Sequence, residues 1–312
     1  MVNVMPGVVF EAERPRETAE FWAALLEGEL VGGDHDSGGY DGGRDRGGRD
    51  AGDDGRGSHV TGGYDGGGLR VRLPDGPTVR VVGATAGKPA KNRIHLDLAS
   101  DGDGDGVARR GTQRAIVDRA IRLGAARIDI GQYAGRVPVP WQVLADPAGN
   151  EFCVLEPRGE YAASGVLAAV VIESPDPHRL AEFWSGATRW PIVRTDPELV
   201  SLRAPGGRGP WLELLSADPC PPVTPRCRLE LTVPPGAPDT AGADTTATGD
   251  AATGDAATGN TATGNTAAGT AAVAPGAFAV EADRLCLLGA TRRGAGRLVD
   301  PDGIVIDLAP GG

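Results

Sequence analysis

The segment LADPAGNEFCVLEP, residues 144–157, returns close to the end of the chain as LVDPDGIVIDLAP, residues 298–310. In both segments an Asp-Pro-x-Gly sequence precedes a short apolar run. Proline presets φ and glycine supplies a positive φ, so each segment predicts a tight turn that leads into a β-strand. One such turn is common, but its return within a chain of 312 residues indicates an internal repeat.

Other segments repeat in the same order. Residues 8–22, VVFEAERPRETAEFW, align without a gap with residues 170–184, VVIESPDPHRLAEFW. Residues 76–98 align in the same way with residues 209–231. The chain is therefore interpreted as a tandem duplication, and its length suits about two domains of ~150 residues each.

Two segments of low complexity interrupt the repeat. Residues 32–68 repeat GGYDGG and GGRD and hold few apolar side chains, which predicts a disordered loop. An Arg-Gly-Gly tract for RNA and a calcium-binding Gly/Asp repeat are alternatives; the excess of Asp over Arg weakens the first, and the lack of regular apolar residues weakens the second. Residues from about 234 to 275 carry the pentads ATGDA and ATGNT and predict a surface insertion. The predicted domains are 1–158, with the first insertion, and 165–312, with the second.

The order of elements also repeats inside each half. A strand (GVVFEAE), a helix over residues 15–26 and short strands around GLRVRL and TVRVVG are followed by a strand (RIHLDLA), a second helix and further strands. Apolar residues at Ile116, Ala120 and Leu123, with Gly124 as a stop signal, support the second helix. The sequence thus predicts an α+β fold with two βαβββ units in each half.

Charge and composition limit the partners. A net charge of −11 argues against binding to a phosphate backbone, which needs clustered Lys and Arg. No apolar run approaches the ~20 residues that cross a bilayer, and the N-terminal segment lacks the charged region of a signal peptide. The four cysteines form no CxxC pair, and the spacing of Cys220 and Cys227 fits no common zinc module. We therefore expect a cytoplasmic protein with a small-molecule ligand and without nucleic acid, membrane or disulfides.

The segment AEFW on the first helix, LGA at the end of the second helix and DPxGN before the last strand resemble the vicinal oxygen chelate superfamily. The resemblance is closest to its glyoxalase-like, bleomycin-resistance-like domains and covers both halves outside the insertions. It implies tandem domains, each with two βαβββ units that form a half-open mixed sheet around a concave pocket. Members include lyases, isomerases, dioxygenases, thiol transferases and drug-sequestering proteins, so the fold does not decide the function.

In metal-dependent members, ligands from the first and last strands of each unit hold a divalent ion on the concave face, with positions left open for substrate oxygens. The resemblance assigns four such positions to each half. In the first half they are Gly7, Arg80, His95 and Cys153, and in the second half Ala169, Glu213, Arg228 and Asp307. Neither set reproduces the usual ligands, so no metal or other cofactor is expected, with a divalent metal as the alternative.

Strand alternation predicts which side chains face the concave side. In RIHLDLA the residues Ile94, Leu96 and Leu98 form the apolar face, which leaves His95 and Asp97 on the other face. The same phase, together with two tryptophans on strands and the assigned positions, gives the full set of pocket candidates. They are His95, Asp97, Trp141, Cys153, Trp211, Glu213, Arg228, Glu230 and Asp307.

The sequence makes more specific predictions for two groups of residues, a cluster of charged side chains and a pair of tryptophans. Glu213, Arg228 and Asp307 are expected to form a charge-compensated cluster, in which the Arg228 guanidinium could bind a carboxylate or phosphate of a ligand. Trp22 and Trp184, each beside a phenylalanine on the first helix of its half, are expected in the core.

The leading functional hypothesis is a protein that binds a small organic molecule in concave pockets without the usual metal site. The first alternative is a metal-dependent lyase, isomerase or dioxygenase with an atypical ligand set. Consecutive units are expected to pair; if the second unit paired with the third instead, His95, Cys153 and Glu213 would converge and could bind iron or zinc. The second alternative is an interaction module that acts through its two insertions.

Overall fold

The computed structural model describes residues 6–32, 67–74, 76–84, 87–102, 110–131, 139–224, 226–233, 276–294 and 296–310. The two interrupting segments lie almost entirely outside these residues, so the expectations for them remain predictions. Among the described residues, none of the helices has the length and apolar character that crossing a membrane requires.

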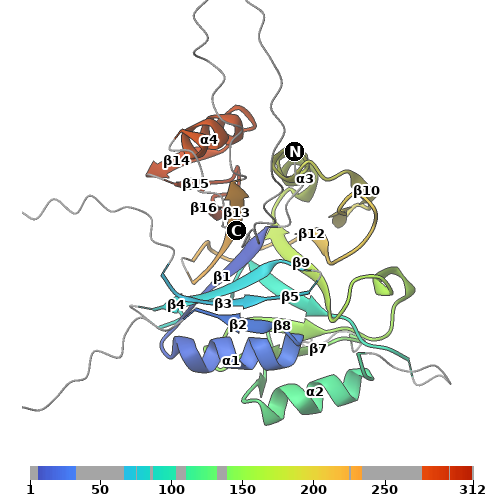
Figure 1. Ribbon diagram of the computed structural model, residues 1–312. Coiled ribbons are helices and arrows are strands. Elements are labelled where there is room, and N and C mark those ends of the chain that lie inside the picture. The colour runs from blue at the N-terminus through green and yellow to red at the C-terminus, as the bar shows by residue number, and fades with distance from the viewer. Residues whose placement is uncertain are drawn as a thin grey trace, which may run out of the picture.

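The described chain forms four βαβββ units (Figure 1). The first unit contains β1 (Gly7–Ala12), α1 (Pro15–Leu26), β2 (Glu29–Val31), β3 (Leu69–Arg72) and β4 (Thr78–Gly83). The second contains β5 (Ile94–Leu98), α2 (Gln113–Arg122), β6 (Ala126–Arg127), β7 (Gln142–Ala145) and β8 (Glu151–Val154). The third contains β9 (Leu167–Ser174), α3 (Pro177–Thr188), β10 (Ile192–Thr195), β11 (Leu199–Leu202) and β12 (Trp211–Ser216). The fourth contains β13 (Cys227–Val233), α4 (Ala277–Leu287), β14 (Thr291–Gly294), β15 (Arg297–Val299) and β16 (Val305–Pro310), and the short helix η1 (Gly159–Tyr161) lies between the two halves.

The four units form two eight-stranded mixed sheets. Sheet A joins the first and fourth units in the order β14-β15-β16-β13-β1-β4-β3-β2, and sheet B joins the second and third in the order β10-β11-β12-β9-β5-β8-β7-β6. The junctions are the antiparallel pairs β1–β13 and β5–β9. The predicted fold class is confirmed, but the expected pairing of consecutive units is wrong.

Helix packing accounts for this pairing. Trp22 of α1 lies edge-on to Phe152 of β8, with ring centroids 5.2 Å apart, so the first unit packs its helix against the apolar face of the second unit. Consecutive units thus contact each other through helix-covered faces, while the edges of β1 and β5 remain to pair with strands of the other half. Trp22 and Trp184 are both fully buried, which confirms their expected place in the core.

Both Asp-Pro-x-Gly turns have the predicted geometry. Gly149 and Gly303 adopt φ values of 82° and 86°, a region that glycine occupies without strain. In the first turn Asp146 Oδ1 accepts hydrogen bonds from the backbone N–H groups of Ala148 and Asn150 at 2.9 and 2.8 Å. Asp300 makes the equivalent pair of bonds in the second turn.

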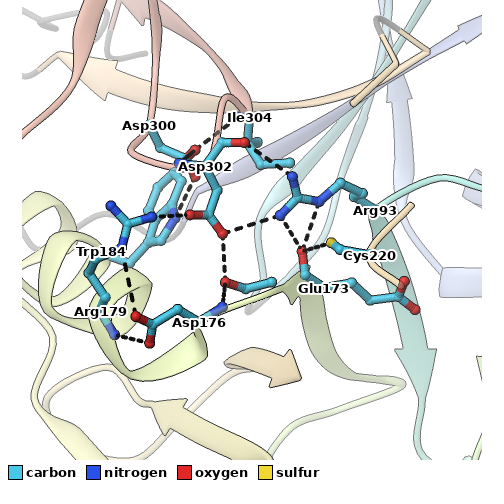
Figure 2. A network of polar contacts seen from close by, with 10 residues as sticks. Arg93, Glu173, Asp176, Arg179, Trp184, Cys220, Asp300, Asp302 and Ile304 are labelled. Atoms are coloured by element: carbon cyan, nitrogen blue, oxygen red, sulfur yellow. Dashed lines mark hydrogen bonds and ion pairs between the residues drawn. The ribbon is translucent and has the colours of Figure 1, made fainter. Parts of the chain in front are cut away.

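The second turn also anchors the junction between the sheets (Figure 2). The Asp302 carboxylate accepts hydrogen bonds from Arg93 in the segment before β5, from Ser174 at the end of β9 and from Arg179 of α3. Arg93 also donates to the backbone carbonyl of Glu173 through Nε, at 2.9 Å. A single turn of sheet A therefore holds the ends of two neighbouring strands of sheet B.

Candidate functional site

A hollow of about 700 Å³ opens on the concave face of sheet B. We call it the sheet-B hollow. Residues of β5, β8, β9 and β12 line it, together with the segments around Lys91, Tyr161 and Pro219. The predicted alternation on β5 is confirmed, because His95 and Asp97 line the hollow while Ile94, Leu96 and Leu98 are buried in the apolar core.

Strand register places two polar groups on the floor of this hollow. Asp97 lies opposite Cys153 across the β5–β8 pair, and His95 lies on the same face two residues earlier. Glu213 lies opposite Val171, which in turn lies opposite His95. Two strand spacings therefore separate the backbones of Glu213 and His95, a distance of about 10 Å.

His95, Asp97 and Cys153 form the first polar group. Their donor atoms all lie within 4.8 Å of one another, and His95 Nε2 is 3.5 Å from Asp97 Oδ1. Burial lowers the pKa of His95 to about 3, so its imidazole is neutral, and burial together with the Glu213 charge raises the pKa of Asp97 to about 8. Burial also raises the pKa of the Cys153 thiol well above its usual value. Among the described residues, His95 Nδ1 and Asp97 Oδ1 have no hydrogen-bond partner.

Glu213 and Tyr161 form the second polar group. Tyr161 Oη donates a hydrogen bond to Glu213 Oε1 at 3.1 Å, and Ser201 Oγ lies 3.5 Å from the same oxygen. Burial raises the pKa values of both Glu213 and Tyr161. Tyr161 belongs to η1 and packs edge-on against Trp211, with ring centroids 6.2 Å apart. The sequence reasoning missed this residue, whose one signal is an aromatic side chain in the short connection between the halves.

Charged pairs lie at the border of the hollow. Lys91 pairs with Glu173, and Arg158 Nε lies 2.7 Å from Glu156 Oε1. Lys91 was also missed, although it is one of only two lysines in a chain that otherwise carries arginine. The cationic groups of Lys91 and Arg158 are thus already paired, whereas Asp218 adds an exposed carboxyl group to the lining.

The concave face of sheet A is filled with charged side chains. We call this set the sheet-A ion-pair network; its members are Glu11, Arg70, Arg80, Arg228, Glu230, Arg297 and Asp307. Asp307, which is fully buried, lies 2.8 Å from the Nε atoms of both Arg228 and Arg297 and 3.1 Å from Arg80.

The structure changes two expectations about this network: that Glu213 belongs to the cluster of Arg228 and Asp307, and that the Arg228 guanidinium is available to a ligand. The expected pairing of Arg228 with Asp307 is present, but Glu213 does not join them, because its strand belongs to sheet B. The Arg228 guanidinium is also engaged by Glu11 at 2.7 Å, so two of its nitrogens already face carboxylates of the protein.

The pocket candidates therefore divide between the sheets. Five of them lie on strands of sheet B: His95, Asp97, Cys153, Trp211 and Glu213. Trp141, which was expected on a strand, lies one residue before β7. Sheet A carries Arg228, Glu230 and Asp307. Trp141 lines the hollow, whereas Trp211 packs beside it under the Arg203 guanidinium, whose carbon lies 4.4 Å from the ring centroid. A role of any of them in ligand binding stays a prediction.

The donor set of the first polar group fits a divalent metal ion. Imidazole, carboxylate and thiolate groups are the ligands that zinc and similar ions take in proteins, and two buried atoms of the group lack a hydrogen-bond partner among the described residues. The pairing of the second and third units does bring His95, Cys153 and Glu213 onto one sheet, as the alternative expectation required. Within the part of the chain that the structure describes, however, the carboxylate whose oxygen lies within 4.8 Å of the donor atoms of His95 and Cys153 is that of Asp97.

Duplicated βαβββ units that form open mixed sheets, one of them with a hollow on its concave face, define a glyoxalase-like class of protein. The family model of the glyoxalase-like domain matches residues 7–155 and 169–309. The chain therefore belongs to this family, and the resemblance to the vicinal oxygen chelate superfamily is confirmed.

Solved structures show similarity at low sequence identity. A single-residue mutant of glyoxalase I from Zea mays is 13% identical, with a TM-score of 0.50 over 97% of this chain and 90% of that chain. A putative dioxygenase from Bacillus subtilis is 12% identical, with a TM-score of 0.47 over 97% of this chain and 84% of that chain. No curated protein matches the sequence. The similarity to the glyoxalase I mutant supports the fold alone.

Proposed function

We propose that the protein binds a small organic molecule in the sheet-B hollow, without the metal ligand set usual for its superfamily. The observation that carries this proposal is the hollow itself, whose volume of about 700 Å³ falls within the range of small-molecule pockets. Its floor holds buried polar atoms of His95 and Asp97 without hydrogen-bond partners among the described residues. Such atoms cost free energy unless a ligand or water meets them.

The lining favours a particular ligand chemistry. Trp141, Leu199 and Leu215 offer apolar surface, whereas the floor offers the groups of His95 and Asp97. The cationic groups of Lys91 and Arg158 are each paired with a glutamate, so an anionic ligand would have to displace an existing ion pair. A largely apolar, uncharged molecule with one or two hydrogen-bonding oxygens or nitrogens fits this arrangement best.

A substitution that fills the hollow tests the proposal. Leu215 lines the hollow, and Val82 holds the repeat-equivalent position on sheet A; both side chains are half-buried. Fractions of a cellular metabolite extract are screened for a rise in melting temperature, and the bound compound is identified by native mass spectrometry. We expect the wild type and Val82→Trp to respond to the same fraction and Leu215→Trp to lose the response. An undiminished response of Leu215→Trp would overturn the proposal.

The His95–Asp97–Cys153 group favours a second candidate function, a metal-dependent lyase, isomerase or dioxygenase. A bound divalent ion would supply Lewis-acid stabilisation of substrate oxygens. The three residues would hold it, while the hydrogen-bonded pair of Tyr161 and Glu213, on the same floor, could accept or return a proton of the substrate. This candidate requires Glu213→Gln to lower turnover while the metal content stays unchanged.

A third candidate, an interaction module, depends on segments outside the described residues. Deletion of residues 33–66 and 235–274 separates it from the others. A small-molecule binder keeps its ligand after this deletion, whereas an interaction module loses its partner.

A further inference from the structure

We propose that His95, Asp97 and Cys153 form a thiolate-containing centre for a zinc-like divalent cation, in which Asp97 is the carboxylate ligand in place of the expected Glu213. This site does not depend on the organic ligand proposed above. In metal-dependent members of the superfamily the metal ligands come from the first and last strands of each unit. The proposed site differs from this pattern, because two of its three ligands come from one strand, β5.

The backbone geometry brings the three ligands together. β5 and β8 are parallel neighbours with Asp97 opposite Cys153, and His95 shares the concave face of β5 with Asp97. The donor atoms lie within 4.8 Å of one another, whereas ligands at zinc-like bond lengths lie roughly 3.5 Å apart. Small side-chain rotations therefore close the site without a change in the backbone.

Burial provides an independent argument for a ligand. His95 is 8% exposed and Asp97 9% exposed, yet His95 Nδ1 and Asp97 Oδ1 have no hydrogen-bond partner among the described residues. A bound cation would satisfy both side chains at once, and all three residues of the group line the sheet-B hollow. Binding releases the protons of the Cys153 thiol and of the Asp97 carboxyl group to solvent, so uptake of the ion lowers the pH of an unbuffered solution.

Among the described residues, Glu213 lies outside the group whose donor atoms meet within 4.8 Å. Its Oε1 is held by Tyr161 Oη, and its backbone lies two strands from that of His95. The thiolate and imidazole select ions such as Zn²⁺ and Co²⁺ over Mg²⁺, Ca²⁺ and Mn²⁺, which prefer oxygen ligands.

Cobalt provides a spectroscopic test on the full chain, purified without a His tag and stripped of metal. Co²⁺ bound by a thiolate gives a sulfur-to-cobalt charge-transfer band in the near ultraviolet. We expect this band in the wild type, with one ion per chain by elemental analysis and displacement by Zn²⁺. The matched control is Cys286→Ser, a half-buried cysteine of α4, which keeps the band. Cys153→Ser loses it, and Cys153→Ala provides a second variant whose fold is checked by circular dichroism.

The ligand assignment is tested by affinity. Asp97→Asn and His95→Gln should each weaken Co²⁺ binding at least about tenfold, because substitution of residues that merely support a metal ligand already causes a loss of this size. Glu213→Gln should leave Co²⁺ binding unchanged. A folded wild type without the band overturns the proposal, as does an equal loss in Glu213→Gln or stronger thermal stabilisation by Mn²⁺ than by Zn²⁺. Leu215→Trp should keep the band, so failure of this site and failure of organic ligand binding give different results.

Discussion

The indole Nε1 of Trp22 donates a hydrogen bond to Asp146 Oδ2 at 2.9 Å, and this bond joins the AEFW segment of the first unit to the DPAG turn of the second. Trp184 Nε1 and Asp300 Oδ2 repeat the contact in the second half, at 3.2 Å. Each bond connects units that belong to one half of the chain but to different sheets. The two sequence segments that reveal the duplication are therefore partners in the structure.

Replacement of Trp22 by Phe should lower the free energy of unfolding by about 1–3 kcal/mol, because a buried carboxylate oxygen loses a donor. Urea denaturation measures this loss. Trp190→Phe is the matched control, since Trp190 is similarly buried but its Nε1 has no hydrogen-bond partner among the described residues. Equal losses in the two variants would show that the hydrogen bond contributes nothing beyond packing.

Asp300 makes stability depend on pH. Burial raises its pKa from 3.8 to about 6, the Asp302 charge adds to this, and the hydrogen bonds from Ile304, Asp302 and Trp184 oppose it. Because the folded-state pKa lies above the unfolded one, the stabilising contribution is complete below about pH 3.8 and is lost as the pH rises through 6. The stability of the wild type relative to Asp300→Asn should fall by up to about 3 kcal/mol from pH 4 to pH 7. Urea denaturation at several pH values measures this difference, and a constant value would contradict the prediction.

Arg93 and Arg226 hold equivalent positions in the repeat and contact the turns of opposite halves. Arg93 Nη1 donates to the backbone carbonyl of Asp302 at 3.1 Å, and its Nη2 lies 3.2 Å from the Asp302 carboxylate (Figure 2). Arg226 Nη2 donates to the backbone carbonyl of Ala148, also at 3.1 Å. The two contacts fasten sheet A to sheet B at both turns; the Arg93 contact includes the Asp302 carboxylate, and the Arg226 contact with Ala148 is to a backbone carbonyl.

Arg93→Met should therefore lower the free energy of unfolding by about 3–5 kcal/mol, because the buried Asp302 charge loses one of its cationic partners. Arg226→Met should cost less, since the turn it contacts has Ala148 in place of that aspartate. Guanidinium denaturation compares the two variants with the wild type. Similar losses would mean that the carboxylate contributes little to the junction.

The sequence carries the local part of this structure. Alternation with period two placed Ile94 on the core face and His95 on the concave face, because the strand geometry leaves no other arrangement once one face is buried. The sequence does not predict which units pair, because no pattern within β1 or β5 specifies the strand that pairs with its edge. The packing of Trp22 against Phe152 determines which units pair. This pairing places Glu213 on sheet B, away from Arg228 and Asp307 on sheet A.

The position of Tyr161 in the sheet-B hollow was not predicted, for a different reason. The repeat comparison identifies positions by their counterparts, and the connection that carries Tyr161 joins the halves only once. Its hydrogen bond to Glu213 becomes visible only when the connection is placed beside sheet B.

The sheet-A ion-pair network should be costly to disturb at its centre. Asp307 faces Arg80, Arg228 and Arg297, so Asp307→Asn leaves buried guanidinium groups without their shared counter-charge and should lower the free energy of unfolding by about 3–5 kcal/mol. The matched control is Glu29→Gln, which removes an exposed partner 3.5 Å from Arg72 and should change stability by less than about 1 kcal/mol.

A double variant separates charge imbalance from general damage in this network. Addition of Arg80→Met to Asp307→Asn removes one of the cations that lost Asp307 as a partner, so the double variant should recover part of the stability lost in the single variant. Urea denaturation of the four proteins gives the coupling free energy. Strictly additive losses would show that Arg80 and Asp307 stabilise the sheet independently, because a shared charge balance requires each substitution to change the cost of the other.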